Sequence, residues 1–226
     1  MAYNRGESKQ IIVGAAALFV SKTAEFVPAN TGTVLPDFVA GTSYRDTLQD
    51  STVVRNVGYT MNGLEIQFQP DFGEVQVDQL LDVAKLYKQG MTVSLNTAFA
   101  EATLENLLVA IAASSTSLIS NIKMDNPLEI NHPSGVNYAD VLDIASGELG
   151  SCPVERGIIA VGPGTGDCAN GTSIERIYVA YRALSIENVT VSAKRDEASM
   201  FEVSFRLLPA NNGSYGKIVD RLVPTS

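Results

Sequence analysis

The residues of this chain whose types could support chemistry lack the partners that the chemistry needs. The run Gly162-Pro163-Gly164-Thr165-Gly166-Asp167 is glycine-rich, as phosphate-binding loops are. Such a loop needs a following Lys-Ser or Lys-Thr at the start of a helix, so that backbone N–H groups and the lysine hold the phosphates. No such pair follows here, and the run is interpreted as the tip of a hairpin.

Acid–base and metal chemistry have equally little support. His132 is the only histidine, and Pro133 follows it in an expected turn. A nucleophilic triad or dyad therefore has no base with supporting neighbours. Asp140 and Asp143 could contact a cation, but their spacing does not resemble that of an EF-hand loop. We expect no catalytic activity, no cofactor and no metal.

The composition fits a folded β-rich protein that does not grip nucleic acid. The chain has 226 residues, of which 45% are hydrophobic and 18% charged. It has no internal repeat, so one domain over residues 1–226 is expected. The formal charge is −9, and Lys194-Arg195 is the only adjacent basic pair. Binding DNA through its phosphates needs clustered Lys and Arg instead.

An apolar run over residues 11–20 follows Arg5 and Lys9, as it would in a secretory signal. The run is too short to cross a bilayer, and Lys22 stands where a cleavage site would need a small residue. We therefore expect a buried first strand from Gln10 to Ser21, and no membrane association.

Four segments alternate apolar and polar residues, which is typical of strands with one packed face and one wet face. They span 64–69, 74–79, 91–96 and 201–208, and further strands are expected at 157–162, 174–184 and 186–194. Residues 78–89 predict a short helical or turn excursion, after which Gly90 lets the chain reverse. The wet face of the first three segments is uncharged or acidic, and its members are Glu65, Gln67, Gln76, Asp78, Thr92, Ser94 and Asn96.

The hydrophobic period changes beyond residue 103. Leu104, Leu107, Leu108 and Ile111 recur at i, i+3, i+4 and i+7, which predicts a helix over 103–113 with these four side chains buried. Thr103 is a suitable N-cap for this helix. A strand therefore passes directly into a capped helix.

This passage carries a resemblance to a known family. Residues Thr97-Ala98-Phe99-Ala100-Glu101-Ala102-Thr103-Leu104-Glu105-Asn106-Leu107 resemble the signature of the major tail tube proteins of long-tailed bacteriophages. Residues 57–70 resemble the strand that opens the central hairpin of such a protein, residues 74–79 its return, and residues 201–209 its last long strand. The resemblance covers about half of the chain and carries nothing onto residues 114–173.

The resemblance implies a mainly β fold: a β-sandwich or half-barrel with one packed α-helix, whose sheets complete an inner β-barrel on oligomerisation. It implies hexameric rings that stack into a hollow virion tail, assembled in the host bacterial cytoplasm, through which the genome is ejected. Implied partners are further copies of the chain, the tape measure, tail terminator and distal tail proteins, and double-stranded DNA in transit. The wet-face residues would then line the lumen, although the solvent face of an ordinary antiparallel sandwich has the same pattern. Six copies at −9 give each ring a formal charge of −54, which would repel phosphate.

Two long segments are interpreted with less support from periodicity. Residues 23–56 form either a flexible surface loop or an arm that a neighbouring subunit orders. The arm is favoured by its apolar residues, Val34, Leu35, Phe38, Val53 and Val54. Residues 114–173 are interpreted as an insertion. Within it, Cys152 and Cys168 have no zinc-binding spacing and are expected as free thiols in a cytoplasm, although an oxidising compartment would permit a bridge.

Two alternatives to the long non-contractile tail stay open. The tube protein of a contractile tail, an injection machine or a type VI secretion system shares the implied fold. A secreted β-sandwich that binds glycans would need a cluster of exposed aromatic residues, whereas this chain has no Trp and eight dispersed Tyr.

Overall fold

The structure is a computed structural model that describes residues 12, 14–23, 25–26, 35–76, 78, 82–122, 139–144, 153–165, 172–191, 195 and 199–224. As predicted, it is mainly β. The strands are β1 (Ala17–Ser21), β2 (Val54–Asn56), β3 (Thr60–Gln76), β4 (Val83–Phe99), β5 (Leu118–Ile122), β6 (Ala139–Leu142), β7 (Arg156–Pro163), β8 (Thr172–Ser185), β9 (Phe201–Leu208) and β10 (Gly216–Pro224). The helices are α1 (Tyr44–Gln49), α2 (Leu104–Ala110) and the single turn η2 (Ser115–Ser117).

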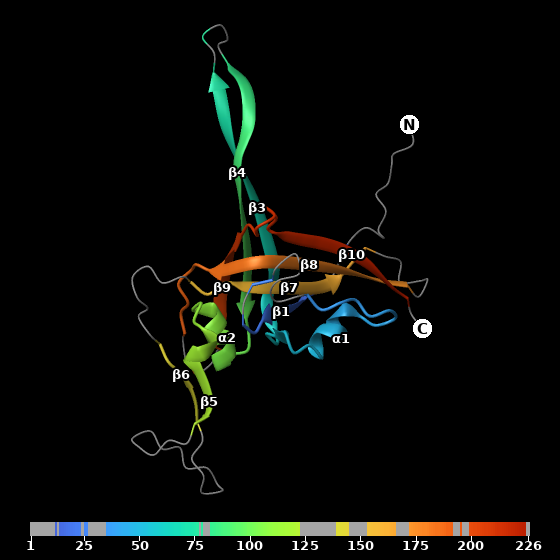
Figure 1. Ribbon diagram of the computed structural model, residues 1–226, viewed down its shortest axis with the longest axis vertical. Helices are drawn as coiled ribbons and strands as arrows, with labels where there is room; N and C mark the ends of the chain where they lie inside the picture. Colours follow the sequence, from blue (N-terminus) through green and yellow to red (C-terminus); the bar gives the residue numbers. More distant parts are fainter. Residues whose placement is uncertain are drawn as a thin grey trace, which may run out of the picture.

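The main sheet is antiparallel and forks at β8. Its strand order is β2-β1-β7-β8-β9-β4-β3, with β10 paired to β8 beside this path. One edge of β8 pairs with β10 over residues 172–180 and then with β9 over residues 182–185. The branch that contains β9, β4 and β3 therefore diverges from β10. Figure 1 shows β3 and β4 running across the direction of β7, β8 and β10.

The first core cluster lies between the two branches. Leu18 of β1 and Ile158 of β7 share this cluster with Leu95 of β4 and Phe205 of β9. Alternation along each strand gives these residues one common inward face. Helix α2 covers the same cluster with Leu108, Val109 and Ala110. The apolar faces predicted for residues 91–96 and 201–208 are therefore buried as expected.

A second core cluster covers the opposite face of β1, β7 and β8. Phe19 and Ile159 are packed there under Phe26, Tyr44 and Leu48, which come from the segment before β2. The short helix α1 in this segment was not predicted, because only two of its six residues are buried. The carboxylate of Glu175 accepts hydrogen bonds of 2.9 and 3.0 Å from the backbone N–H of Tyr44, which ties the start of α1 to β8.

The segment interpreted as an arm is packed on its own subunit wherever the structure describes it. Val54 lies in the second core cluster, and Leu35 and Val53 are half-buried against it. Phe38 is exposed, but the centroid of its ring lies 4.7 Å from that of Tyr44, and the guanidinium of Arg221 lies over the Phe38 ring. The prediction that a neighbouring subunit orders this segment is therefore wrong for residues 35–56. Val34 lies outside the described residues.

Helix α2 has the predicted cap but a different buried face. The Thr103 hydroxyl accepts a 3.2 Å hydrogen bond from the backbone N–H of Asn106. Leu108 is buried and Leu107 packs at the border of the core, but Leu104 and Ile111 are 39% and 37% exposed, so their predicted burial is wrong.

A polar residue sets the rotation of α2. The Asn106 amide donates to the carbonyls of Val57 and Glu101, at 2.8 and 2.9 Å, and its oxygen accepts a 2.7 Å bond from Arg55 Nη1. These bonds satisfy a buried amide that would be costly to leave unpaired, so Asn106 points inward. An apolar stripe alone carries no sign of this contact.

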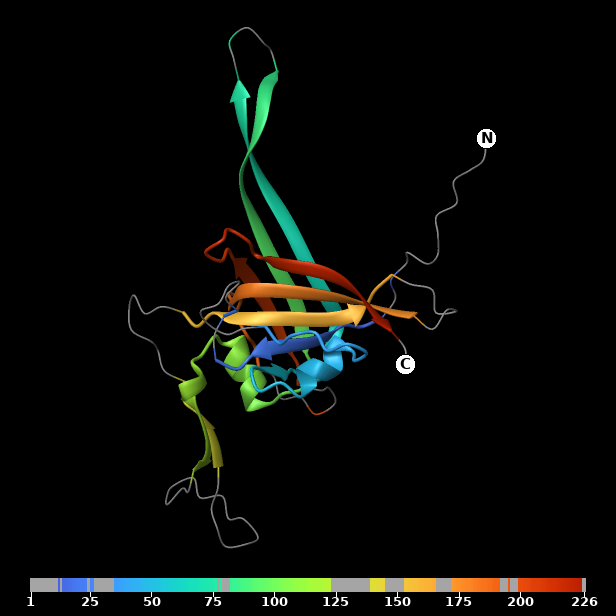
Figure 2. The same cartoon turned by 45° about the vertical axis from the view of Figure 1, so that its right-hand side comes forward.

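The central hairpin is longer than predicted. Residues 74–76 continue β3 rather than forming its return, and β4 begins at Val83, where a helical or turn excursion was expected. Gly90 does not reverse the chain, since it lies within β4 opposite Asp71. The two strands are 17 residues each, and their outer part projects well beyond the sheet (Figures 1 and 2).

The boundaries of several other strands also differ from the predicted ones. β1 starts at Ala17 rather than Gln10, and residues 186–191 form no strand. β10 was not predicted. The expected strands at 157–162 and 174–184 are confirmed as β7 and β8, but β7 is central to the sheet although it lies inside the expected insertion. Among the described residues of that insertion, β5 and β6 form a small sheet separate from the main one.

Candidate functional site

The outer face of β3, β4 and β9 is a continuous polar surface. Across β3 and β4, Glu65 is paired with Asn96 and Gln67 with Ser94. The intervening pair of Ile66 and Leu95 points the other way, toward the first core cluster. Five of the seven predicted lumen residues therefore share one face: Glu65, Gln67, Thr92, Ser94 and Asn96.

Gln76 and Asp78 do not belong to this polar face. Gln76 follows Glu65 by an odd number of residues along β3, and the two register irregularities between these residues are extra residues on β4, so alternation puts Gln76 on the opposite face. Asp78 lies in the turn beyond the end of β3. Grouping these two with the other five was wrong, because the grouping took residues 74–79 for a returning strand.

The polar face is hydrogen-bonded and carries little charge. Gln67 Nε2 donates to Glu65 Oε1 at 2.8 Å, and the Ser204 hydroxyl donates to Asn96 Oδ1 at 2.7 Å. Along the stretch where β9 pairs with β4, the charged groups on this face are Glu65, Glu202 and Arg206. Ser204 is buried, whereas Glu65, Gln67 and Thr92 are exposed to water. The face lacks the cluster of basic side chains that would hold phosphates.

The projecting part of the hairpin, described over residues 71–76 and 82–87, exposes apolar side chains to solvent. Phe72 is 55% and Leu86 is 60% exposed, and Val75 and Tyr87 are also exposed. The tip is acidic, since residues 71–82 contain four acidic residues and no Lys or Arg. This surface was not predicted, because residues 74–79 were interpreted as a returning strand with one packed face and residues 78–89 as a helical or turn excursion.

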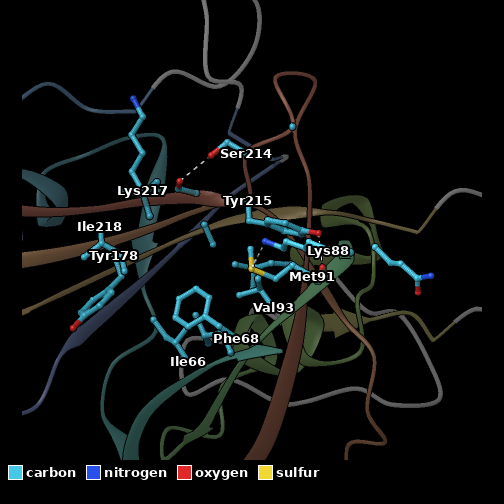
Figure 3. Close-up of a pocket in the computed structure, with 18 residues that line it drawn as sticks. Ile66, Phe68, Lys88, Met91, Val93, Tyr178, Ser214, Tyr215, Lys217 and Ile218 are labelled. Atoms are coloured by element: carbon cyan, nitrogen blue, oxygen red, sulfur yellow. Dashed lines mark hydrogen bonds between the residues drawn. The ribbon is translucent and has the colours of Figure 1, made fainter. Parts of the chain in front are cut away.

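An apolar groove lies at the base of this hairpin, where the two branches of the sheet diverge. Its volume is about 620 Å³. Ile66, Phe68 and Met91 contribute one side, while Tyr178, Tyr215 and Ile218 are among the residues that contribute the other. Figure 3 shows these side chains arranged around the hollow. The Tyr215 hydroxyl donates a 2.6 Å hydrogen bond to the Met91 carbonyl, which links the two walls of the groove.

β10, the far wall of the groove, pairs with β8 along its length and also carries an exposed ion pair with it. Arg176 of β8 donates two hydrogen bonds of 2.6 Å to the carboxylate of Asp220, its register partner on β10. This guanidinium lowers the pKa of Asp220. The charged residues that line the groove are Lys88 and Lys217, and none of the lining residues is acidic.

Two long strands have a free edge within the described part of the chain. There, β3 pairs with β4 alone and β10 pairs with β8 alone. A row of unpaired backbone donors and acceptors is a template for pairing with another chain. The edges of β3 and β10 are therefore available for pairing with another strand.

The residues considered for chemistry form no site in the described part of the chain. Gly164 donates its backbone N–H to the Ile174 carbonyl at 2.7 Å and has no room for a side chain beside Ile174, so it closes the β7–β8 hairpin. Asp140 lies on β6 and Asp143 follows it, and no described group of three or more His, Cys, Asp or Glu could hold a metal ion. His132, Cys152 and Cys168 lie outside the described residues.

Comparison of the sequence with protein-family models gave no match, and comparison with curated proteins gave none either. Among the described residues, no helix has the length and apolar character needed to span a membrane.

Proposed function

We propose that this chain is a structural protein that assembles into hollow tubes, as the tail tube protein of a long-tailed bacteriophage. Its copies form hexameric rings in which the polar face of β3, β4 and β9 lines the lumen, and the rings stack into a virion tail. The hexamer, the lumen and the virion location come from the resemblance in residues 97–107. The fold supports the proposal through features that do not depend on that resemblance.

The observation that carries the proposal is the contrast between the two faces of the β9-β4-β3 branch. One face is packed into the first core cluster, and the other presents Gln, Ser, Thr and Asn side chains with few charges. A channel that passes DNA needs a wall of this kind, because basic side chains would hold the phosphates by releasing counterions, and apolar ones would leave the wall poorly hydrated.

The free edges of β3 and β10 supply a means of closing the barrel. Natural proteins protect long edge strands, and a closed barrel removes the edges altogether. In a ring, the edge of one subunit would be covered by its neighbour. Assembly would thus protect the same backbone groups that make the isolated subunit prone to associate.

Sedimentation velocity over a range of protein and salt concentrations tests the proposal. The expected result is a monomer that converts to a species of six copies, followed by larger species at higher concentration. Monomer at every concentration and salt level would overturn the proposal.

A further inference from the structure

We propose that the groove between the two branches of the sheet is a binding site for an alkyl carboxylate, a molecule with one hydrocarbon chain and one carboxylate head group. The hydrocarbon chain lies along the apolar walls, and the carboxylate pairs with the ammonium of Lys88. All the lining residues belong to a single copy of the protein. The site therefore goes beyond the proposed assembly and does not depend on it.

The groove is apolar down to its floor. Its volume of about 620 Å³ is typical of small-molecule sites. Val93, Leu95 and Leu207 of its lining are buried members of the first core cluster, so the floor is the core itself. In the walls, Phe68 and Ile218 are 55% and 56% exposed. A hydrocarbon chain in the groove would remove these side chains from water, which is favourable in proportion to the apolar area covered.

A β-bulge turns Lys88 toward the groove. Pro70 of β3 is paired with Met91 of β4, which lines the groove. Two residues further along β3, Phe72 is paired with Lys88, so Gln89 is an extra residue on β4. The extra residue puts Lys88 on the same face as Met91, whereas strict alternation would put it on the polar face. Bulges re-aim side chains in this way and are over-represented beside functional sites.

The ammonium of Lys88 has no strong acceptor in the described part of the chain. Its Nζ lies 3.8 Å from Sδ of Met91, and a thioether sulfur accepts hydrogen bonds only weakly. Figure 3 shows this contact within the hollow. Lys88 takes part in none of the ion pairs between described residues. A ligand carboxylate would give the ammonium a charge-assisted hydrogen bond in place of the weak one.

The lining favours an anion with a single hydrocarbon chain. Its charged residues are Lys88 and Lys217, and it contains no acidic residue. A cationic amphiphile would therefore meet like charges, whereas an anionic one would be attracted. The hydrogen bond from the Tyr215 hydroxyl to the Met91 carbonyl links the two walls. This link opposes the widening of the groove that a lipid with two hydrocarbon chains would need.

Isothermal titration calorimetry with octanoate, decanoate and dodecanoate, each below its micelle concentration, tests the site. One molecule should bind per subunit, and each added methylene that is buried should lower the Kd about fourfold. Decanol, which lacks the charge, should bind about tenfold more weakly than decanoate, and decyltrimethylammonium more weakly still. Equal affinity for the three head groups, or binding of no carboxylate in the series, would overturn the proposal.

Two matched pairs of variants test whether the groove is where decanoate binds. Lys88→Gln removes the ammonium, and Lys85→Gln makes the same change at an exposed residue of β4 outside the lining. Ile218→Glu puts a carboxylate in the groove wall, and Leu222→Glu puts one on β10 outside the lining, where Leu222 is 61% exposed.

Lys88→Gln and Ile218→Glu should each raise the Kd of decanoate about tenfold, while the two control variants should stay within about twofold of the parent. If a control loses as much affinity as its partner, decanoate binds as an adventitious additive only, and the site is refuted.

Deleting Gln89 tests the role of the bulge. The deletion keeps Lys88 and the net charge but removes the extra residue, so alternation returns the ammonium to the polar face. The Kd of decanoate should rise about tenfold, as for Lys88→Gln. Gln89→Ala is the matched control, because it keeps the bulge and should bind like the parent. Far-UV circular dichroism checks that each variant is folded. A folded deletion variant with parental affinity would contradict the placement of Lys88 as the partner of the carboxylate.

Discussion

Replacing leucines on α2 by alanine tests which face of the helix is buried, and therefore how the helix is rotated about its axis. Leu108 is 5% exposed and belongs to the first core cluster, whereas Leu104 is 39% exposed at the start of the helix. Leu108→Ala removes three buried carbons, each worth roughly 0.8 kcal/mol in transfer free energy, and leaves a cavity. The free energy of unfolding should therefore fall by about 2–5 kcal/mol.

Leu104→Ala is the matched control. It makes the same chemical change on the same helix, and alanine is at least as good a helix former as leucine. Because much of the Leu104 side chain is already in water, the free energy of unfolding should change by less than about 1 kcal/mol.

Urea unfolding of the unassembled subunit, followed by far-UV circular dichroism, measures both changes. The denaturant midpoint should shift for Leu108→Ala with an unchanged slope. If Leu104→Ala costs as much as Leu108→Ala, then α2 has the rotation that its apolar stripe predicts, and the role given to Asn106 is wrong.

Three further predictions follow from the same structure. Combining Gln67→Lys with Thr92→Lys on the polar face should change the free energy of unfolding of the subunit by under about 0.5 kcal/mol. The assembled tubes should nevertheless bind duplex DNA, with an affinity that falls steeply as the salt concentration rises. If the variant tubes bind DNA no better than the parent tubes, these two residues do not face the lumen. Burial, and then the charge of Asp37, raises the pKa of Tyr44 to about 12, above its value of about 10 in an unfolded chain, so the stabilising effect is complete below pH 10 and is lost as the pH rises toward 12. Tyr44→Phe should flatten this loss in urea titrations at successive pH values, and an unchanged slope would count against it. Deleting residues 36–50 should prevent folding rather than only assembly, because it removes two buried side chains of the second core cluster, and a native-like circular dichroism spectrum from the deletion would contradict this.

The parts of the fold that sequence could predict include the strands with one packed face and the apolar run of β7, which is buried on both faces. Residues 91–96 and 201–207 alternate strictly because one side meets the first core cluster and the other carries polar side chains. β10 gave no such signal. Its apolar residues stand as the neighbouring pairs Ile218-Val219 and Leu222-Val223, with Ile218 and Leu222 exposed, so no period of two appears.

The position of the turn in the β3–β4 hairpin was predicted wrongly for a related reason. Pro70 and Gly73 are turn signals, and the apolar residues change from even to odd positions between Phe68 and Val75. Where the ribbon leaves the body of the subunit, both faces are exposed and the parity of its apolar residues has no packing consequence. Proline is tolerated there because β3 is an edge strand.

Of the candidate site, the shared face of Glu65, Gln67, Thr92, Ser94 and Asn96 was predictable, but the groove was not. The groove depends on the fork at β8, which brings Tyr178 and Ile218 opposite Phe68 from distant parts of the sequence. Side chains that meet only through such a fork leave no local pattern. The same holds for α1, which is held by Glu175 from a strand more than a hundred residues later.

Electron microscopy of the purified, concentrated protein tests the central claim most directly. End-on views should show rings of six subunits around an open lumen, and side views should show those rings stacked into tubes of uniform width. A reconstruction should place β3, β4 and β9 at the inner wall, with Gln67 and Ser94 facing the lumen. Discrete closed particles without a channel, or tubes whose inner wall is formed by β5 and β6, would contradict the account.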